Sequence, residues 1–389
     1  MSGPAAPAMR LLIAAASGSP PRAFASVAVA EDDWTALPEL AARHGLVAVL
    51  ARRLPERADA PPSVRSDVDG RARLQAVHAL EGIKELLRAV RTLADRGITA
   101  VALKGPLFSQ WLYGDAGMRQ FVDLDLLVRP EDRNAALHAL APLGYRLPYG
   151  MPAGTARVVY AGLRAWPLEH ERGSVLDLHW GTAHARFGAP LDAATILRES
   201  IAIPAGGVEV RVPAATHAAL LTLAHAAKHL WRPLESIHAI AQLLRRPDVD
   251  WLQVKALACR SGAWTGCATG LELAARLLDG RLPAALYGAP LPPASIALAE
   301  AAQRDLLLGG LTEKDRWTER RAQRAALDGA RARLRYDLWR LLAPTPLEWE
   351  WWPLPPSLAP LYVPLRLLRL ASGAGGGLLT EGRSSRAIP

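Results

Sequence analysis

Two aspartates lie inside an apolar run of the chain, and they are the residues best suited to chemistry. Asp123 and Asp125 interrupt FVDLDLLV, which otherwise has the composition of a buried strand. In a strand, residues i and i+2 project from one face, so the carboxylates would lie together and the leucines would face the core. A divalent cation between the acids would remove their mutual repulsion. The pattern indicates a metal site for phosphoryl transfer, although an exposed edge strand can carry paired acids too.

A third carboxylate occurs in a similar setting further along the chain. In SVLDLHW, Asp177 alternates with two leucines, as Asp123 does, and we expect it on a neighbouring strand. His179 would share its face and is a candidate substrate contact. We therefore expect Asp123, Asp125 and Asp177 to form one group of carboxylates on adjacent strands.

Two basic positions precede these acids. Lys104 and Gly105 end a short β-branched run, where glycine lets the backbone approach a phosphate and lysine adds a compact positive charge. Arg119 could bind a phosphate or the carboxylates bidentately. We predict all three as nucleotide-binding residues. The alternatives are a surface lysine for Lys104 and, for Arg119, a structural ion pair with Asp115 or an aspartate of the motif.

A further set of polar residues lies in HAAKHLW. His225 and His229 would share one helical face, with Lys228 beside them. A metal pair is one interpretation, but the glutamate of H-E-x-x-H is missing. Lys228 and His229 are candidate substrate contacts, and a polar helix face is the plain alternative.

The elements that must position these residues can be inferred from periodicity and turn signals. Helices are expected within 33–97, separated by a loop at 55–67 and ending at Gly97, since apolar residues recur at three- and four-residue spacing. After Gly97 we expect a strand at 98–105, a helix at 106–113 and a helix from Pro130 to Gly144. Strands are expected within 156–180, with a turn at Arg172-Gly173, and a further strand or hairpin at 206–213.

This mixture predicts an α+β fold with four parts. They are an N-terminal helical region (1–97), an α+β core (98–212), a helical domain (213–340) and a Pro/Trp-rich C-terminal arm (341–389) whose Gly/Ser-rich end we expect to be disordered. The cleft between the core and the helical domain would hold the acceptor. The tryptophans of the arm would pack on the core or form an acceptor platform.

Composition narrows the class of protein. The chain has 389 residues, of which 50% are hydrophobic, and a formal net charge of +9. Such a charge favours anionic partners, but no nucleic-acid-binding motif accompanies it. Two cysteines make no disulfide framework, which predicts a cytoplasmic protein. No apolar run is long enough to predict a membrane span.

The segments ALKG, MRQFVDLDLLVRPEDRNAALHALAPLGY and EHERGSVLDLHW together resemble the nucleotidyltransferase family of the polymerase-β superfamily, often labelled uncharacterised nucleotidyltransferase. The resemblance is most specific over about 98–182 and extends weakly to HAAKHLW (225–231) and to LPPSLAPLYVPLRLLRL near the end. It implies a mixed sheet flanked by helices, and a metal-dependent enzyme that transfers a nucleoside monophosphate from an NTP to an acceptor hydroxyl and releases pyrophosphate. ATP is the expected NTP, and a small molecule, a peptide or an RNA end is the expected acceptor.

The resemblance also implies roles for individual residues. Asp123 and Asp125 would hold two Mg²⁺ ions, and Asp177 would complete the second metal site and assist deprotonation of the acceptor. Lys104 and Gly105 stand where the wider superfamily has a Gly-Ser pair that holds the triphosphate. Pro106 follows Gly105, so the serine hydroxyl is missing and the nucleotide preference is open. The alternative is a non-catalytic nucleotide- or partner-binding module of the same fold, in a biosynthetic or toxin–antitoxin system.

Overall fold

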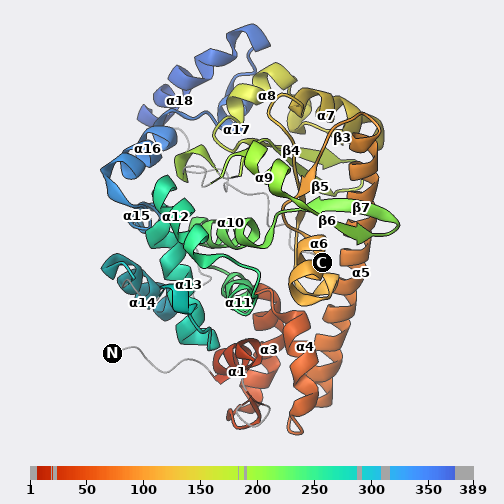
Figure 1. Ribbon diagram of the computed structural model, residues 1–389, viewed down its shortest axis with the longest axis vertical. Helices are drawn as coiled ribbons and strands as arrows, with labels where there is room; N and C mark the ends of the chain where they lie inside the picture. The colour runs from red at the N-terminus through yellow and green to blue at the C-terminus, as the bar shows by residue number, and fades with distance from the viewer. Residues whose placement is uncertain are drawn as a thin grey trace. The chain divides into compact units, whose positions relative to one another are not determined.

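The computed structural model describes most of the chain (Figure 1), namely residues 7–18, 20, 24–182, 184–187, 191–286, 291–307 and 316–372. The predicted disordered end of the C-terminal arm lies outside these ranges. The chain forms two compact units. We call them the helical unit (Met1–Ile83, Pro106–Gln120 and Ala215–Asp328) and the sheet unit (Lys84–Gly105, Phe121–Ala214 and Gly329–Pro389).

The helical unit begins with short amphipathic helices. Its first elements are α1 (Pro7–Ser17), α3 (Glu31–Arg43), α4 (Val47–Arg53), the 3₁₀ turn η1 (Leu54–Glu56) and the first part of α5 (Pro62–Ala94). Three acidic residues open α3, where they interact favourably with the positive end of the helix dipole. Leu11, Leu12 and Leu37 are fully buried. The loop predicted at 55–67 is shorter in the structure, because α5 already begins at Pro62.

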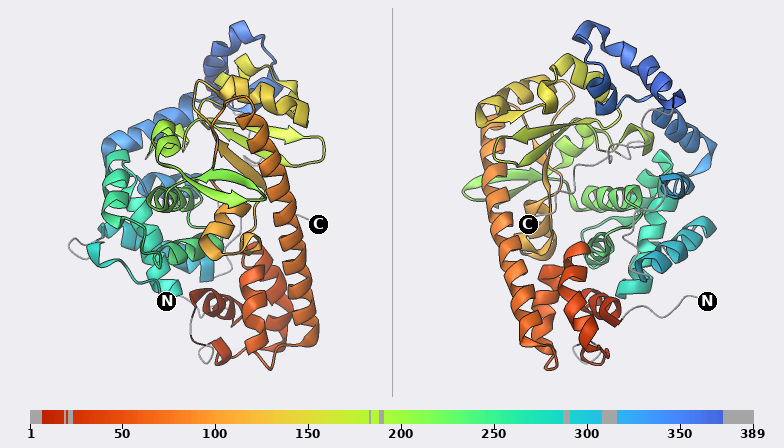
Figure 2. Two further views of the ribbon diagram at one scale, coloured as in Figure 1. Left: turned by 45° about the vertical axis from the view of Figure 1, so that its right-hand side comes forward. Right: turned by 180° about the vertical axis from the view of Figure 1, so that it is seen from behind.

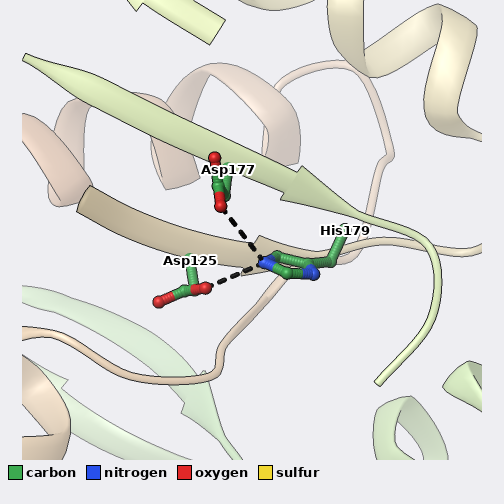
Figure 3. A group of neighbouring side chains, drawn as sticks. All are labelled: Asp125, Asp177 and His179. Carbon is green, nitrogen blue, oxygen red and sulfur yellow. Dashed lines mark hydrogen bonds and ion pairs between the residues drawn. The ribbon is translucent and has the colours of Figure 1, made fainter. Parts of the chain in front are cut away.

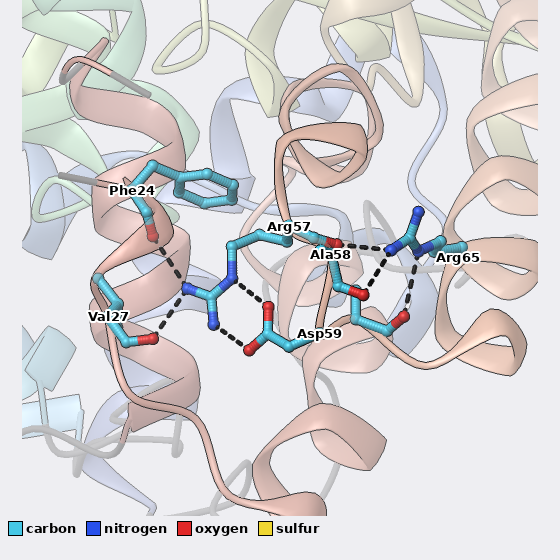
Figure 4. Close-up of polar contacts among 7 residues, drawn as sticks. Phe24, Val27, Arg57, Ala58, Asp59 and Arg65 are labelled. Atoms are coloured by element: carbon cyan, nitrogen blue, oxygen red, sulfur yellow. Dashed lines mark hydrogen bonds and ion pairs between the residues drawn. The ribbon is translucent and has the colours of Figure 1, made fainter. Parts of the chain in front are cut away.

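A buried arginine fixes the connection between α4 and α5 (Figure 4). Arg57 donates from Nη1 to the carbonyl oxygens of Phe24 and Val27, at 2.9 and 2.8 Å, and pairs bidentately with Asp59 at 2.8 and 2.6 Å. Arg65 in turn donates to the Arg57 carbonyl oxygen at 2.5 Å. These charge-assisted bonds hold segments that are distant in sequence, and they satisfy a guanidinium that would be costly to bury alone.

The rest of the helical unit packs around α10 (Ala215–Lys228). This helix contacts α11 (Leu234–Leu243), α12 (Trp251–Ser261) and α13 (Trp264–Leu278). Gly266 and Gly270 let neighbouring groups approach α13 closely, since a Cβ at Gly270 would lie 2.9 Å from the Ile240 Cδ1. The remaining elements of the unit are α6 (Pro106–Tyr113), η2 (Ala116–Met118), η6 (Ala284–Leu286), α14 (Pro293–Leu307) and α15 (Arg316–Ala325).

The sheet unit is built on a seven-stranded mixed sheet in the order β3-β4-β5-β2-β1-β7-β6. The β6–β7 hairpin forms one edge of it, as Figures 1 and 2 show. β2 pairs in parallel with β5 and β1 in parallel with β7, whereas the other pairs are antiparallel. The strands are β1 (Val101–Ala102), β2 (Asp123–Leu127), β3 (Tyr145–Arg146), β4 (Ala165–His170), β5 (Val175–His179), β6 (Ile201–Ala205) and β7 (Val208–Val212).

Helices and turns complete the sheet unit. The end of α5 is tied to the β6–β7 turn, since Arg91 Nη2 donates to the Gly206 carbonyl oxygen at 3.0 Å. The other elements are α7 (Arg133–Leu140), η3 (Ala141–Leu143), η4 (Pro148–Gly150), α8 (Ala153–Val159), η5 (Ala185–Phe187), α9 (Ala193–Glu199), α16 (Gly329–Leu342), α17 (Pro346–Trp351), η7 (Pro356–Leu361) and α18 (Tyr362–Ala371).

The α+β class predicted from the sequence is confirmed, and so are most turn signals. Gly97, Gly144 and Gly173 have φ of 70°, 98° and 88°, a left-handed region open to glycine, at the predicted ends and turn. One prediction is wrong: the segment 153–159 is helix α8, so the strands begin only at Ala165. The residues TARVV suit a strand by composition, but α8 packs against η7, and tertiary contacts override that preference. Among the described residues, no helix is long and apolar enough to cross a membrane.

Candidate active site

The parallel pairing of β2 with β5 brings the predicted acids together. In this register Asp125 lies opposite Asp177, Asp123 opposite Val175, and Leu127 opposite His179. Paired residues of parallel strands project from the same face, so both strands contribute polar side chains to one face. Leu124, on the other face of β2, is 3% exposed, as the core-facing prediction requires.

The side chains of Asp125, Asp177 and His179 converge on this face (Figure 3). His179 Nε2 lies 2.8 Å from Asp125 Oδ1 and 4.0 Å from Asp177 Oδ2. One ligand atom from each residue lies within 4.8 Å of the others. Asp125 is only 3% exposed, whereas the side chains of Asp177 and His179 retain 26% and 16% of their exposure. In this cluster Asp125 of β2 is buried, whereas Asp177 and His179 of β5 remain accessible to solvent.

Asp123 experiences the charge of this cluster without joining its three ligand atoms. Burial raises the pKa of the Asp123 carboxyl to about 7, and the negative charges of Asp125 and Asp177 add to the effect. The positive charge of Lys104 and the imidazole of His179 act in the opposite direction. The negative charge of the three carboxylates thus exceeds the positive charge of the neighbouring basic groups. Such an excess of negative charge favours the binding of a divalent cation.

Lys104 and Gly105 lie beside the cluster within the sheet unit. Lys104 Nζ is 3.6 Å from Asp125 Oδ1, and the Leu103 N–H donates to the Asp125 carbonyl oxygen at 3.0 Å. Gly105 has φ of 79°, so the turn after the strand requires a left-handed residue. In this structure Lys104 is therefore a counter-ion of the acids. Its predicted contact with phosphate stays a prediction.

Arg119 belongs to the helical unit, and there it pairs with Glu235 of α11. Arg119 Nε and Nη2 both donate to the Glu235 carboxylate, the second at 3.1 Å, and the two side chains are 14% and 8% exposed. The ion pair with Glu235 is one that the sequence did not suggest. No local pattern of residues pointed to Glu235, because it lies far from Arg119 in the chain. A nucleotide-binding role for Arg119 stays a prediction.

Lys228 and His229 lie at the end of α10, also in the helical unit. The ring centroids of His225 and His229 are 4.5 Å apart, although His229 follows the last residue of α10. The Lys228 carbonyl oxygen accepts a hydrogen bond from Gln323 Nε2 at 2.9 Å. Substrate contact by Lys228 and His229 stays a prediction.

The residues present fit a divalent cation. Carboxylate oxygens are the preferred ligands of Mg²⁺, and an added imidazole is compatible with Mn²⁺ and related ions. The sequence identified Asp125 and Asp177 as ligands and placed His179 on their face as a substrate contact. It did not identify His179 as a member of the ligand group, although the alternation in LDLH contained that signal.

Comparison with family models matches residues 30–279, more than half of the chain, to a family described as uncharacterised nucleotidyltransferase. The matched segment contains Lys104, Asp123, Asp125, Asp177 and His179. Comparison with curated proteins finds no match.

Two solved structures are similar to parts of the chain. One is the solution structure of the antibiotic-resistance factor ANT(2'')-Ia, with 15% identity, a TM-score of 0.33, and coverage of 46% of this chain and 89% of that one. The other is an antigenic nucleotidyltransferase-like protein from Paracoccidioides brasiliensis, with 12% identity, a TM-score of 0.31, and coverage of 54% and 98%. Both likenesses concern about half of this chain.

Proposed function

The chain belongs to the family of uncharacterised nucleotidyltransferases, and from that premise we propose that it transfers a nucleoside monophosphate from an NTP to an acceptor hydroxyl, with release of pyrophosphate. The observation that carries the proposal is the register of β2 and β5, which sets Asp125 opposite Asp177 on one face. Phosphoryl transfer depends chiefly on positioning and on neutralisation of charge, and this face offers groups for both.

Asp123, Asp125 and Asp177 are the proposed metal ligands, with Mg²⁺ as the proposed ion. Bound divalent ions would neutralise the triphosphate and fix its orientation. His179 Nε2, at 2.8 Å from Asp125 Oδ1, orients that buried carboxylate when it donates its N–H. Lys104 Nζ lies 3.6 Å from the same oxygen, and its positive charge is proposed to pair with phosphate oxygens of the NTP.

The proposed chemical step uses the more exposed acid. The acceptor oxygen attacks the α-phosphorus, a new P–O bond forms, and the bond to the bridging oxygen breaks as pyrophosphate leaves. Asp177, which retains 26% of its side-chain exposure, accepts the proton of the acceptor hydroxyl. Asp125 is too buried to accept this proton, and its proposed role is that of a metal ligand that also contacts His179 and Lys104. The NTP is proposed to be ATP.

The test measures pyrophosphate release from each of the four NTPs, with Mg²⁺, with Mn²⁺ and with EDTA, in the presence of a mixed acceptor extract. Asp125→Asn and Asp177→Asn should each reduce release at least a hundredfold. Glu131→Gln is the matched control, since it removes one carboxylate from an exposed turn and should leave release unchanged. Equal release by the wild type and both active-site variants would refute the catalytic assignment.

A second readout separates catalysis from binding. Retention of radiolabelled ATP is measured by equilibrium dialysis with and without Mg²⁺, using the same variants. Mg²⁺-dependent retention without turnover under any acceptor condition would favour a nucleotide-binding module of the same fold. Absence of Mg²⁺-dependent retention would favour a partner-binding module instead.

A further inference from the structure

The sheet unit contains a cavity of about 490 Å³ that includes none of the residues of the acid cluster. Ligand pockets for small molecules have volumes of roughly 300–1,000 Å³. The walls that matter for its chemistry come from segments distant in sequence: Arg133 of α7, Arg157 of α8, Arg164 before β4, Trp180 after β5, Asp192 before α9, and Trp339 of α16.

Strand alternation separates this cavity from the acids. Trp180 follows His179 directly and continues the ladder, since its N–H donates to the Arg164 carbonyl oxygen at 3.0 Å. Its ring packs edge-on against Trp166 at 5.2 Å, and Trp166 lies opposite Leu178 in the register of β4 and β5. Trp180 therefore shares the face of Leu178, whereas Asp177 and His179 project from the opposite face.

The residues that line the cavity include three arginines and one aspartate. The guanidiniums of Arg157 and Arg164 form no hydrogen bond or ion pair with any residue that the structure describes. Arg133 donates from Nη1 to the Pro130 carbonyl oxygen at 3.0 Å, but its buried Nε has no partner among the described residues. Asp192 is the one carboxylate of the lining, and it accepts from Thr195 as the N-cap of α9.

Arg164 has an unusual backbone conformation. Its φ is 57°, a left-handed value that is unfavourable for a side chain of this size. Its aliphatic stem passes over Gly181, where a Cβ would lie only 2.6 Å from the Arg164 Cδ. Burial lowers the pKa of the guanidinium, which is consistent with a cation that lacks a compensating anion. An anion that joined this partly desolvated cation would offset the cost of its burial.

Two indoles complete the walls. Trp180 contacts Arg133, whose guanidinium carbon lies 5.7 Å from the ring centroid, and Trp339 lines the cavity from α16. Guanidiniums bind phosphate oxygens bidentately, and indole faces stack on flat rings. We propose that this cavity is a second ligand site of the protein, which binds a small phosphate monoester carrying a flat ring, of the size of a nucleoside monophosphate. It is separate from the metal-dependent site and needs no divalent ion.

The experiment measures binding of AMP by isothermal titration calorimetry in EDTA, which removes divalent ions from the acid cluster. AMP should bind the wild type and Asp125→Asn alike. Arg157→Gln and Arg164→Gln should each weaken binding at least tenfold, and Arg172→Gln, which removes an exposed arginine at the β4–β5 turn, should not. Adenosine and inorganic phosphate should each bind at least tenfold more weakly than AMP. Adenosine lacks the phosphate that the arginines would bind, and inorganic phosphate lacks the ring that the tryptophans would contact.

Three binding results would overturn the proposal: no AMP binding in EDTA, AMP binding by both arginine variants as tight as by the wild type, or loss of AMP binding in Asp125→Asn. Arg157 is exposed, so its variant tests the site even if Arg164→Gln does not fold. Photo-crosslinking of the wild type with 8-azido-AMP supplies a readout without mutation. Label should appear in the peptides of Trp180 or Trp339, and label confined to peptides outside the cavity would also refute the site.

Discussion

The negative charge of the ionised Asp123 carboxylate should make the metal-free protein less stable than its Asp123→Asn variant. Burial and two neighbouring carboxylates raise the pKa of Asp123 from the ordinary value of 3.8 to about 7. At about 1.4 kcal/mol per tenfold change in proton affinity, that difference corresponds to an upper bound of about 4 kcal/mol. Because the side chain is partly exposed and the charge is shared among three carboxylates, we expect about 2 kcal/mol.

The sign of the effect depends on pH. A carboxyl whose folded pKa lies above its unfolded value destabilises the fold when it ionises, so the penalty is absent below about pH 3.8 and complete above about pH 7. Urea unfolding in EDTA should therefore show Asp123→Asn to be more stable than the wild type by about 2 kcal/mol at pH 8, and the difference should fall by at least half at pH 5. Adding Mg²⁺ should stabilise the wild type more than the variant, which lacks one of the three proposed carboxylate ligands.

A matched control makes the result specific. Glu131→Gln removes one carboxylate from an exposed position of the same unit, and it should change the unfolding free energy by less than about 0.5 kcal/mol at either pH. The reasoning would be refuted if Asp123→Asn were less stable than the wild type at pH 8 in EDTA. A stabilisation that does not change between pH 8 and pH 5 would refute the electrostatic origin.

Three further substitutions test other parts of the structure. Glu235→Gln should destabilise the protein by about 3 kcal/mol in urea unfolding, because it leaves the buried charge of Arg119 without its carboxylate; a loss below about 1 kcal/mol would contradict this. Burial, with a smaller effect of Arg245 and Arg119, lowers the pKa of His238 to about 3, so stability that is full above pH 6.5 is lost as the pH falls. His238→Gln should reduce the slope of unfolding free energy between pH 6 and pH 4 by about 1.4 kcal/mol per pH unit, and an unchanged slope would count against a neutral buried imidazole. Gly144→Ala should lower the melting temperature, since φ is 98° and the new Cβ would lie 2.8 Å from His170 Nε2; an unchanged melting temperature would show that the turn adapts.

The sequence by itself determined the acidic character of the candidate site and much of its local setting. Alternation in FVDLDLLV and VLDLH requires acids on one face and leucines on the other, whatever the strands pair with. Glycine at Gly97, Gly144 and Gly173 marked helix ends and a turn, because only a residue without a side chain adopts left-handed φ at little cost. These are local properties of the chain, so periodicity and residue type are sufficient to predict them.

Only the tertiary structure decided which residues meet. The parallel register sets Asp125 against Asp177 rather than against Val175, and a shift by one residue would turn the acids away from each other. The pairing of Arg119 with Glu235, and the conversion of an expected strand into α8, depend likewise on contacts between segments far apart in sequence. Such contacts are stabilised by burial and by charge pairing in the assembled core, and no local pattern of residue types records them.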